Sequence, residues 1–300
     1  MLLNKICCSL FIITTFVTGC SVLSPERTVK GSNNNNAVTP SSQTGFINPR
    51  QLYADCTFGN KLESCNKGLE IMPSVQMNEN TKNEVIWEMT EKACALKDYE
   101  KCSSIGHLLI MGEGLTTYAP VKQVEKGLNL LIEACNNGDG ASCGTIASSL
   151  WGNEHSPNYN LGYSNYDKEV IGKLLGFNYN NDKQRINKMF DYSQKACNLD
   201  KLECWHLGLM YRLGVAPVNK DINKALTYYS YSDAKEREVE KTRDIRASYS
   251  AGPLGEIYES KKDYKKAISY YERDCSISTK HGAAPEFNSS CQKINLLKNK

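Results

Sequence analysis

The stretch CWHLGLMYRLG at residues 204–214, followed by DINKALTYY at residues 221–229, decides the fold of this chain. Apolar residues recur every three or four positions in both parts, which predicts two amphipathic helices. Gly214 stands where the first helix needs a C-terminal cap, because glycine adopts the left-handed backbone without strain. Gly208 would let the two helices approach closely, and tyrosines of the second helix would fill the space between them. The stretch therefore predicts a helical hairpin.

The hairpin pattern recurs along the chain. Its cleanest period runs from Lys188 to Lys224, a distance of 36 residues. The first helix of each unit carries an apolar residue followed by glycine or alanine, at Ile105-Gly106, Ile146-Ala147, Leu207-Gly208 and Leu254-Gly255. Such units bury their apolar faces only by stacking on their neighbours. We therefore predict an all-α fold of about four to five stacked hairpins with half-units at both ends.

Ten of the thirteen cysteines are predicted to form disulfides. In chain order they pair as Cys56/Cys65, Cys94/Cys102, Cys135/Cys143, Cys197/Cys204 and Cys275/Cys291. Zinc ligands typically come as Cys-x2-4-Cys, a spacing that none of these pairs has. One unit has Asp233 in place of its leading cysteine and Ala251 in place of the trailing one. Joint loss is what a bonded pair predicts, since a lone thiol outside the cell is reactive.

Two segments depart from the repeat. Residues 152–181 are inserted between a first helix and its partner and are rich in Asn, Tyr and Gly, with a helix expected at 168–175. Long loops in compact folds are often functional. Residues 235–246 are a charged run beside the junction that lacks cysteines. We interpret this run as the solvated end of an extended helix.

The first 19 residues have the features of an export signal. Lys5 supplies a positive start, and the apolar run 6–17 is too short to cross a membrane core of about 30 Å. The segment ends in Val17-Thr18-Gly19-Cys20, which resembles the lipobox of bacterial lipoproteins. The resemblance implies cleavage before Cys20 and its fatty acylation. The alternative is an ordinary signal peptide in which Cys20 is incidental.

Residues 20–48 include the run GSNNNN and cannot bury a core, so we predict a flexible tether. Ser21, rather than Asp, follows the cysteine, and the lipoprotein resemblance then implies an outer-membrane protein that faces the periplasm or the cell surface. We expect a monomer that is held at the membrane by its lipid alone. The net charge of +3 does not suggest nucleic-acid binding, which needs a clustered basic face.

The pattern of residues 204–229 resembles the Sel-one-like repeat, a relative of the tetratricopeptide repeat. The Cys-x7-Cys spacing points to its Helicobacter cysteine-rich protein branch, sometimes labelled cysteine-rich β-lactamases. The resemblance covers about residues 49–297 and implies an α/α superhelical solenoid of disulfide-stapled helical hairpins. It also implies a concave, partner-binding groove lined by the first helix of each hairpin. The residues expected to bind a partner are Trp205, His206, Arg212, His107 and Met111, with Trp151 at the mouth of the insertion.

Three classes of function remain open. The residues favour a scaffold for a protein or peptide partner in the cell envelope, and an immunity or inhibitor lipoprotein against an envelope-targeting toxin is a special case of it. The third class, a β-lactam-binding or β-lactam-hydrolysing protein, needs a serine nucleophile, and Ser-x-x-Lys occurs at Ser64, Ser232 and Ser290. The Lys-Thr-Gly and Ser-Asp-Asn elements of those enzymes do not occur, so no catalytic residue is assigned. No metal-ligand spacing links the four histidines, and no metal or cofactor is predicted.

Overall fold

The computed structural model describes residues 48–112, 123–151, 163–245 and 247–298. Within these ranges the chain is helical and contains no strand. The expected export signal, the lipidated Cys20 and the tether lie outside them. None of the helices described is both long enough and apolar enough to cross a membrane.

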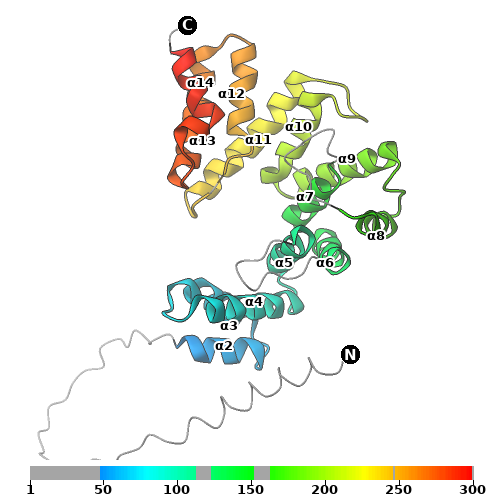
Figure 1. The fold of residues 1–300 in the computed structure, drawn as a ribbon, viewed down its shortest axis with the longest axis vertical. Helices are drawn as coiled ribbons and strands as arrows, with labels where there is room; N and C mark the ends of the chain where they lie inside the picture. The colour runs from blue at the N-terminus through cyan, green and yellow to red at the C-terminus, as the bar shows by residue number, and fades with distance from the viewer. Residues whose placement is uncertain (1–47, 113–122, 152–162, 246, 299–300) are drawn as a thin grey trace, which may run out of the picture. The chain divides into compact units, whose positions relative to one another are not determined.

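The described helices form five hairpins that pack on one another in chain order (Figure 1). The hairpins are α3 (Leu62–Ile71) with α4 (Glu79–Ala95), α5 (Tyr99–Met111) with α6 (Val124–Asn136), α7 (Gly140–Ser149) with α9 (Asp182–Leu199), α10 (Trp205–Leu213) with α11 (Ile222–Glu240), and α12 (Ala251–Ser260) with α13 (Tyr264–Lys280). Half-units stand at the ends as α2 (Pro49–Thr57) and α14 (Ser289–Leu297), and short 3-10 helices are η1 (Met72–Ser74), η4 (Lys201–Cys204) and η5 (Pro285–Phe287). The prediction of an all-α solenoid of stapled helical hairpins is confirmed.

Glycines on the first helices let large side chains of the second helices lie against the backbone. A Cβ added at Gly208 of α10 would lie 2.9 Å from the ring of Tyr229, and one at Gly255 of α12 would lie 2.5 Å from the ring of Tyr271. Both tyrosines are fully buried. Because close-packed interiors leave no room for an added methyl group, only glycine fits at these two contacts. The expected close approach of the paired helices is therefore confirmed for both hairpins.

Local signals in the sequence explain where the helices begin and end. Helices α5 and α10 end at Gly112 and Gly214, whose φ angles of 68° and 75° are left-handed. Helix α11 begins after Asp221, whose carboxylate accepts the backbone N–H groups of Asn223 and Lys224 at 3.0 and 2.9 Å. This side chain satisfies N–H groups that have no partner within the helix.

Five disulfides staple the second helix of one unit to the first helix of the next. Their Cα–Cα separations run from 4.3 to 5.0 Å. The bonded pairs are those expected from the sequence, namely Cys56–Cys65, Cys94–Cys102, Cys135–Cys143, Cys197–Cys204 and Cys275–Cys291. They hold the junctions α2–α3, α4–α5, α6–α7, α9–η4 and α13–α14.

The remaining junction, between α11 and α12, has no cysteines and is held by buried charges. Asp233, in the frame position of the leading cysteine, is 6% exposed, and Glu236 is 2% exposed. Arg273 of α13 donates to both carboxylates at 3.0 Å. Burial acts to lower the pKa of Arg273, but its hydrogen bond to Glu236 and the negative charges beside it raise the pKa above its ordinary value. The guanidinium therefore stays charged between the two carboxylates.

Glu236 also holds the start of α12. Its two oxygens accept the hydroxyl of Ser248 at 2.5 Å and the backbone N–H of Tyr249 at 3.0 Å. The Ser248 hydroxyl in turn accepts the N–H of Ala251, which occupies the frame position of the trailing cysteine, at 3.0 Å. The interpretation of residues 235–246 as a solvated helix end is thus wrong for Glu236, which is buried because charged and polar partners surround it.

The insertion contains a helix, α8 (Asn165–Leu175), which packs against α6. The helix begins three residues before its expected start because Ser164 and Asp167 form a capping box. The Ser164 hydroxyl accepts the N–H of Asp167 at 3.1 Å, and the Asp167 carboxylate accepts the N–H of Ser164 at 2.9 Å. Residues 152–162 of the insertion lie outside the described part of the chain.

Candidate functional site

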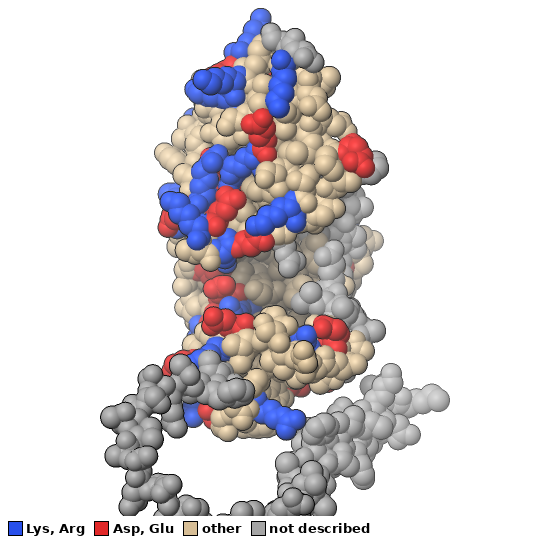
Figure 2. Space-filling model, turned by 90° about the vertical axis from the view of Figure 1, so that its left-hand side faces the viewer, with Lys and Arg blue, Asp and Glu red and all other residues tan. Residues whose placement is uncertain are grey.

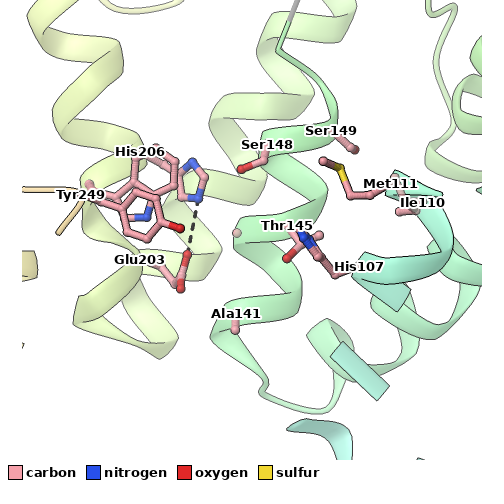
Figure 3. Close-up of a pocket in the computed structure, with 12 residues that line it drawn as sticks. His107, Ile110, Met111, Ala141, Thr145, Ser148, Ser149, Glu203, His206 and Tyr249 are labelled. Atoms are coloured by element: carbon pink, nitrogen blue, oxygen red, sulfur yellow. Dashed lines mark ion pairs between the residues drawn. The ribbon is translucent and has the colours of Figure 1, made fainter. Parts of the chain in front are cut away.

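A cavity, here called the groove pocket, lies between the first helices of successive units (Figure 3). Helices α5 and α7 contribute His107, Met111, Gly144 and Thr145, and the opposite wall carries Glu203, Trp205, His206 and Tyr249. The cavity has a volume of about 190 Å³. Sites for small-molecule ligands usually measure about 300–1,000 Å³, so this one suits a single side chain better. Figure 2 shows the surface hollowed at the height of α5 and α7 in Figure 1.

An aromatic stack forms one wall of the groove pocket. The ring of Trp205 stacks on the rings of His206 and Tyr249, with centroid separations of 3.7 and 4.8 Å. Trp205 and His206 are 8% and 1% exposed, whereas Tyr249 is half exposed. Burial raises the pKa of Tyr249, and the carboxylates of Glu203 and Glu236 raise it further. The phenol therefore stays neutral at physiological pH and can donate a hydrogen bond.

Glu203 and His206 lie together on the same wall. The Nε2 atom of His206 is 3.4 Å from the Oε2 atom of Glu203 (dashed line in Figure 3). Gly144 of α7 faces this pair, and a Cβ added there would lie 2.1 Å from Glu203 Oε2. Any larger residue at that position would displace the carboxylate. The Nδ1 atom of His206 is buried and makes no hydrogen bond.

The groove pocket continues into a shallower hollow, which shares His107, Ala141 and Thr145 with it. The charged residues that line this second hollow are Glu100, Asp139, Asp200 and Arg243. Asp139 and Asp200 also cap the N-termini of α7 and η4. With Glu203 included, the linings of the two hollows hold four carboxylates and one guanidinium. The two hollows together, here called the groove, are therefore lined by more negative than positive charges.

Four of the six residues proposed from sequence to bind a partner line the groove pocket. They are His107, Met111, Trp205 and His206. Trp205 and His206 are more deeply buried than that role suggested, because His206 stacks on Trp205, which in turn stacks on Tyr249. Met111 is partly buried and His107 is exposed.

The other two proposed residues lie apart from the pocket lining. Arg212 forms an ion pair with Glu256 of α12. Trp151 is 3% exposed and belongs to the core cluster that includes Leu150 and Met189, so its placement at an exposed mouth of the insertion is corrected. A buried tryptophan between hairpins contributes to packing and offers no surface to a partner.

Sequence reasoning missed three residues of the site, Glu203, Gly144 and Tyr249. Gly144 follows a trailing cysteine directly, yet the same frame position holds Ser103 and Trp205 in other units, so the repeat carries no signal for it. Tyr249 lies just before α12 and reaches the pocket only because α11 and α12 fold back beside α10. Glu203 lies inside the loop closed by Cys197–Cys204, where the repeat pattern assigns no role to a charged residue.

The described residues contain no group of three or more His, Cys, Asp or Glu side chains placed to hold a metal ion. The Ser-x-x-Lys matches do not form a common site either. Ser232 donates to the backbone carbonyl of Leu202 at 2.7 Å, and Ser290 donates to the carboxylate of Asp274 at 2.6 Å. Neither serine hydroxyl is thereby directed at a lysine.

Comparison with known proteins finds likeness among solved structures only. No protein-family model matches the chain, and no curated protein matches it. Among solved structures, the chain is similar to a Sel1 repeat protein from Oxalobacter formigenes, with 14% sequence identity and a TM-score of 0.46. The match covers 84% of this chain and 98% of that one. A likeness of this degree says nothing about a shared partner.

Proposed function

We propose that the hairpin stack is an interaction scaffold that binds a segment of a protein or peptide partner in the groove. The observation that carries this proposal is the position of the hollow. It is lined by α5, α7 and α10, the first helices of three successive units, while large side chains of the second helices pack between helices. Repeat solenoids use such successive faces as extended binding surfaces.

The contacts of two candidate serines, Ser290 and Ser149, do not favour a nucleophilic role. A nucleophilic serine needs a base within hydrogen-bond reach, at roughly 2.6–3.2 Å. Lys293, which follows Ser290 in one Ser-x-x-Lys match, instead pairs with Glu259 at 2.7 Å. The groove pocket itself holds Ser148 and Ser149, and Ser149 donates to the backbone carbonyl of Ile146 at 2.7 Å.

The groove is tested by removing an exposed side chain from its rim. Tyr249→Ala should weaken capture of the partner from envelope extracts about tenfold, because a half-exposed aromatic residue beside a pocket can bury a large area on binding. Trp205 and His206 are poor choices for this test, since both are packed in the wall and their loss would disturb the fold. Quantitative pull-down with the purified chain measures the effect.

Tyr166→Ala is the matched control, because Tyr166 of α8 is also exposed but lies outside the pocket lining. Both variants should keep the helical circular dichroism of the parent. Equal capture by the parent and the Tyr249 variant, or equal losses in both variants, would remove the groove from the proposal.

We further propose that the scaffold is a lipoprotein of the cell envelope, anchored through Cys20 and sorted to the outer membrane. The supporting pattern is an apolar run that ends in Val17-Thr18-Gly19-Cys20. Cys20→Ala should abolish incorporation of a palmitate analogue and leave the chain uncleaved or soluble, because two or more acyl chains are needed for stable anchoring. Gel fluorescence after metabolic labelling gives the readout, and persistent labelling of the variant would rule the anchor out.

A further inference from the structure

We infer that the groove pocket receives a lysine or arginine side chain from a basic segment of the partner. This inference rests on the proposed scaffold function and names the chemistry of the segment that the groove takes. Three features of the lining lead to it. The Glu203 carboxylate has its histidine neighbour as far away as 3.4 Å, the Nδ1 atom of that histidine makes no hydrogen bond, and negative charge is in excess along the groove.

Glu203 supplies the counter-charge for the incoming cation. Its carboxylate is 14% exposed, so most of its water shell has been removed on folding. The Nε2 atom of His206 lies beside it at 3.4 Å, which is longer than a charge-assisted hydrogen bond of about 2.7–2.9 Å. A partly buried carboxylate that has lost hydrating water is stabilised by a hydrogen-bond donor that comes closer than 3.4 Å. It also attracts a cation more strongly than a fully solvated carboxylate does, because less water screens the two charges.

His206 supplies a second acceptor. A neutral imidazole carries a single ring proton, and a proton on Nε2 faces Glu203. In the neutral ring Nδ1 is then an acceptor, and this atom is buried without a hydrogen bond. An ammonium has three N–H donors and a guanidinium has five, so either brings donors to a wall whose polar atoms have few of them. A carboxylate guest would meet repulsion from Glu203, and an apolar guest would bring it no hydrogen-bond donor.

The rest of the groove favours the same guest. The ring of Tyr249 is half exposed at the pocket, and aromatic rings attract nearby cations through their π electrons. The adjoining hollow adds three carboxylates against the single guanidinium of Arg243. Residues on either side of the inserted side chain should therefore also be basic or neutral.

The probe is a library of random 12-residue peptides displayed on phage, selected on the immobilised full chain with its disulfides intact. Selected peptides should carry a net positive charge and share one lysine or arginine. Glu203→Gln keeps the shape of the side chain and removes its charge, so it should weaken binding of a synthesised selected peptide at least tenfold. Replacing the shared basic residue of the peptide by glutamine should cause a similar loss of affinity. Combining this peptide with the Glu203→Gln variant should cause little further loss, because both changes remove the same interaction.

Glu63→Gln is the control, because Glu63 is an exposed carboxylate of α3 outside both hollows. It should leave the affinity unchanged. Selected peptides that lack a charge bias, or that bind the Glu203 variant as tightly as the parent, would overturn the cationic guest while Tyr249-dependent binding keeps the scaffold. If no peptide is enriched above a blank surface, and no partner is captured from extracts, the scaffold function fails as well.

Discussion

Reduction of the disulfides should unfold most of the hairpin stack at room temperature without denaturant. Four bonds join cysteines seven to nine positions apart, and one joins cysteines 16 apart. In the chain-entropy account, each shorter loop contributes about 2.5 kcal/mol and the longer one about 3 kcal/mol. Together they reach the order of 10 kcal/mol, comparable with the whole free energy of unfolding of a typical domain, about 5–15 kcal/mol. Far-ultraviolet circular dichroism before and after a phosphine reductant measures the loss of helix.

The position of a staple should determine how far its loss spreads. Each unit contacts its neighbours in the stack, so a terminal defect frays one end while a central defect separates two halves. Cys135→Ser with Cys143→Ser, between α6 and α7, should therefore lower the urea midpoint of most of the helical signal. Cys56→Ser with Cys65→Ser, between α2 and α3, should lose only the signal of the first helices. A fully helical reduced chain would show that packing alone holds the stack.

Features that depend on neighbours in the sequence can be predicted from the sequence alone. Cys197 and Cys204 are seven residues apart, so any helical hairpin brings them together. Gly208 and Tyr229 belong to helices joined by one short loop, and their contact follows from pairing those helices. Local caps such as Gly214 follow from backbone conformation alone.

Features that join different units could not be predicted from the repeat. Tyr249 stacks on Trp205, which lies 44 positions earlier in the chain, and no periodic pattern marks that pair. Arg273 reaches Asp233 across 40 residues, and in the sequence it looks like any exposed charge of a helix. The burial of the Trp205 and His206 side chains likewise depends on contacts with neighbouring units. Sequence thus indicated which helices line the groove, but not which of their side chains remain open.

Removing the guanidinium at the unstapled junction should be among the most damaging single substitutions. Arg273→Met leaves Asp233 and Glu236 buried as like charges without their shared partner. Breaking a buried ion pair from one side costs about 3–5 kcal/mol, because it leaves an uncompensated buried charge. Here that charge is Glu236, since Asp233 keeps its contact with Arg237. The carboxylates of Glu236 and Asp233 would also repel each other, and Glu236 would lose its hydrogen bonds with Ser248 and Tyr249 at the start of α12. Urea unfolding followed by circular dichroism should show a midpoint well below that of the parent.

Two further variants separate this explanation from a loss of packing. Arg237→Met removes the other arginine that contacts Asp233, but the Arg237 side chain is half exposed, so its cost should stay below about 1 kcal/mol. Adding Asp233→Asn and Glu236→Gln to Arg273→Met removes the uncompensated charges and should restore much of the lost stability. If Arg273→Met proves as mild as Arg237→Met, the junction is held by apolar contacts between α12 and α13. If instead the combined variant is less stable than Arg273→Met alone, the hydrogen bonds of Glu236 to the start of α12 matter more than the pairing of its charge.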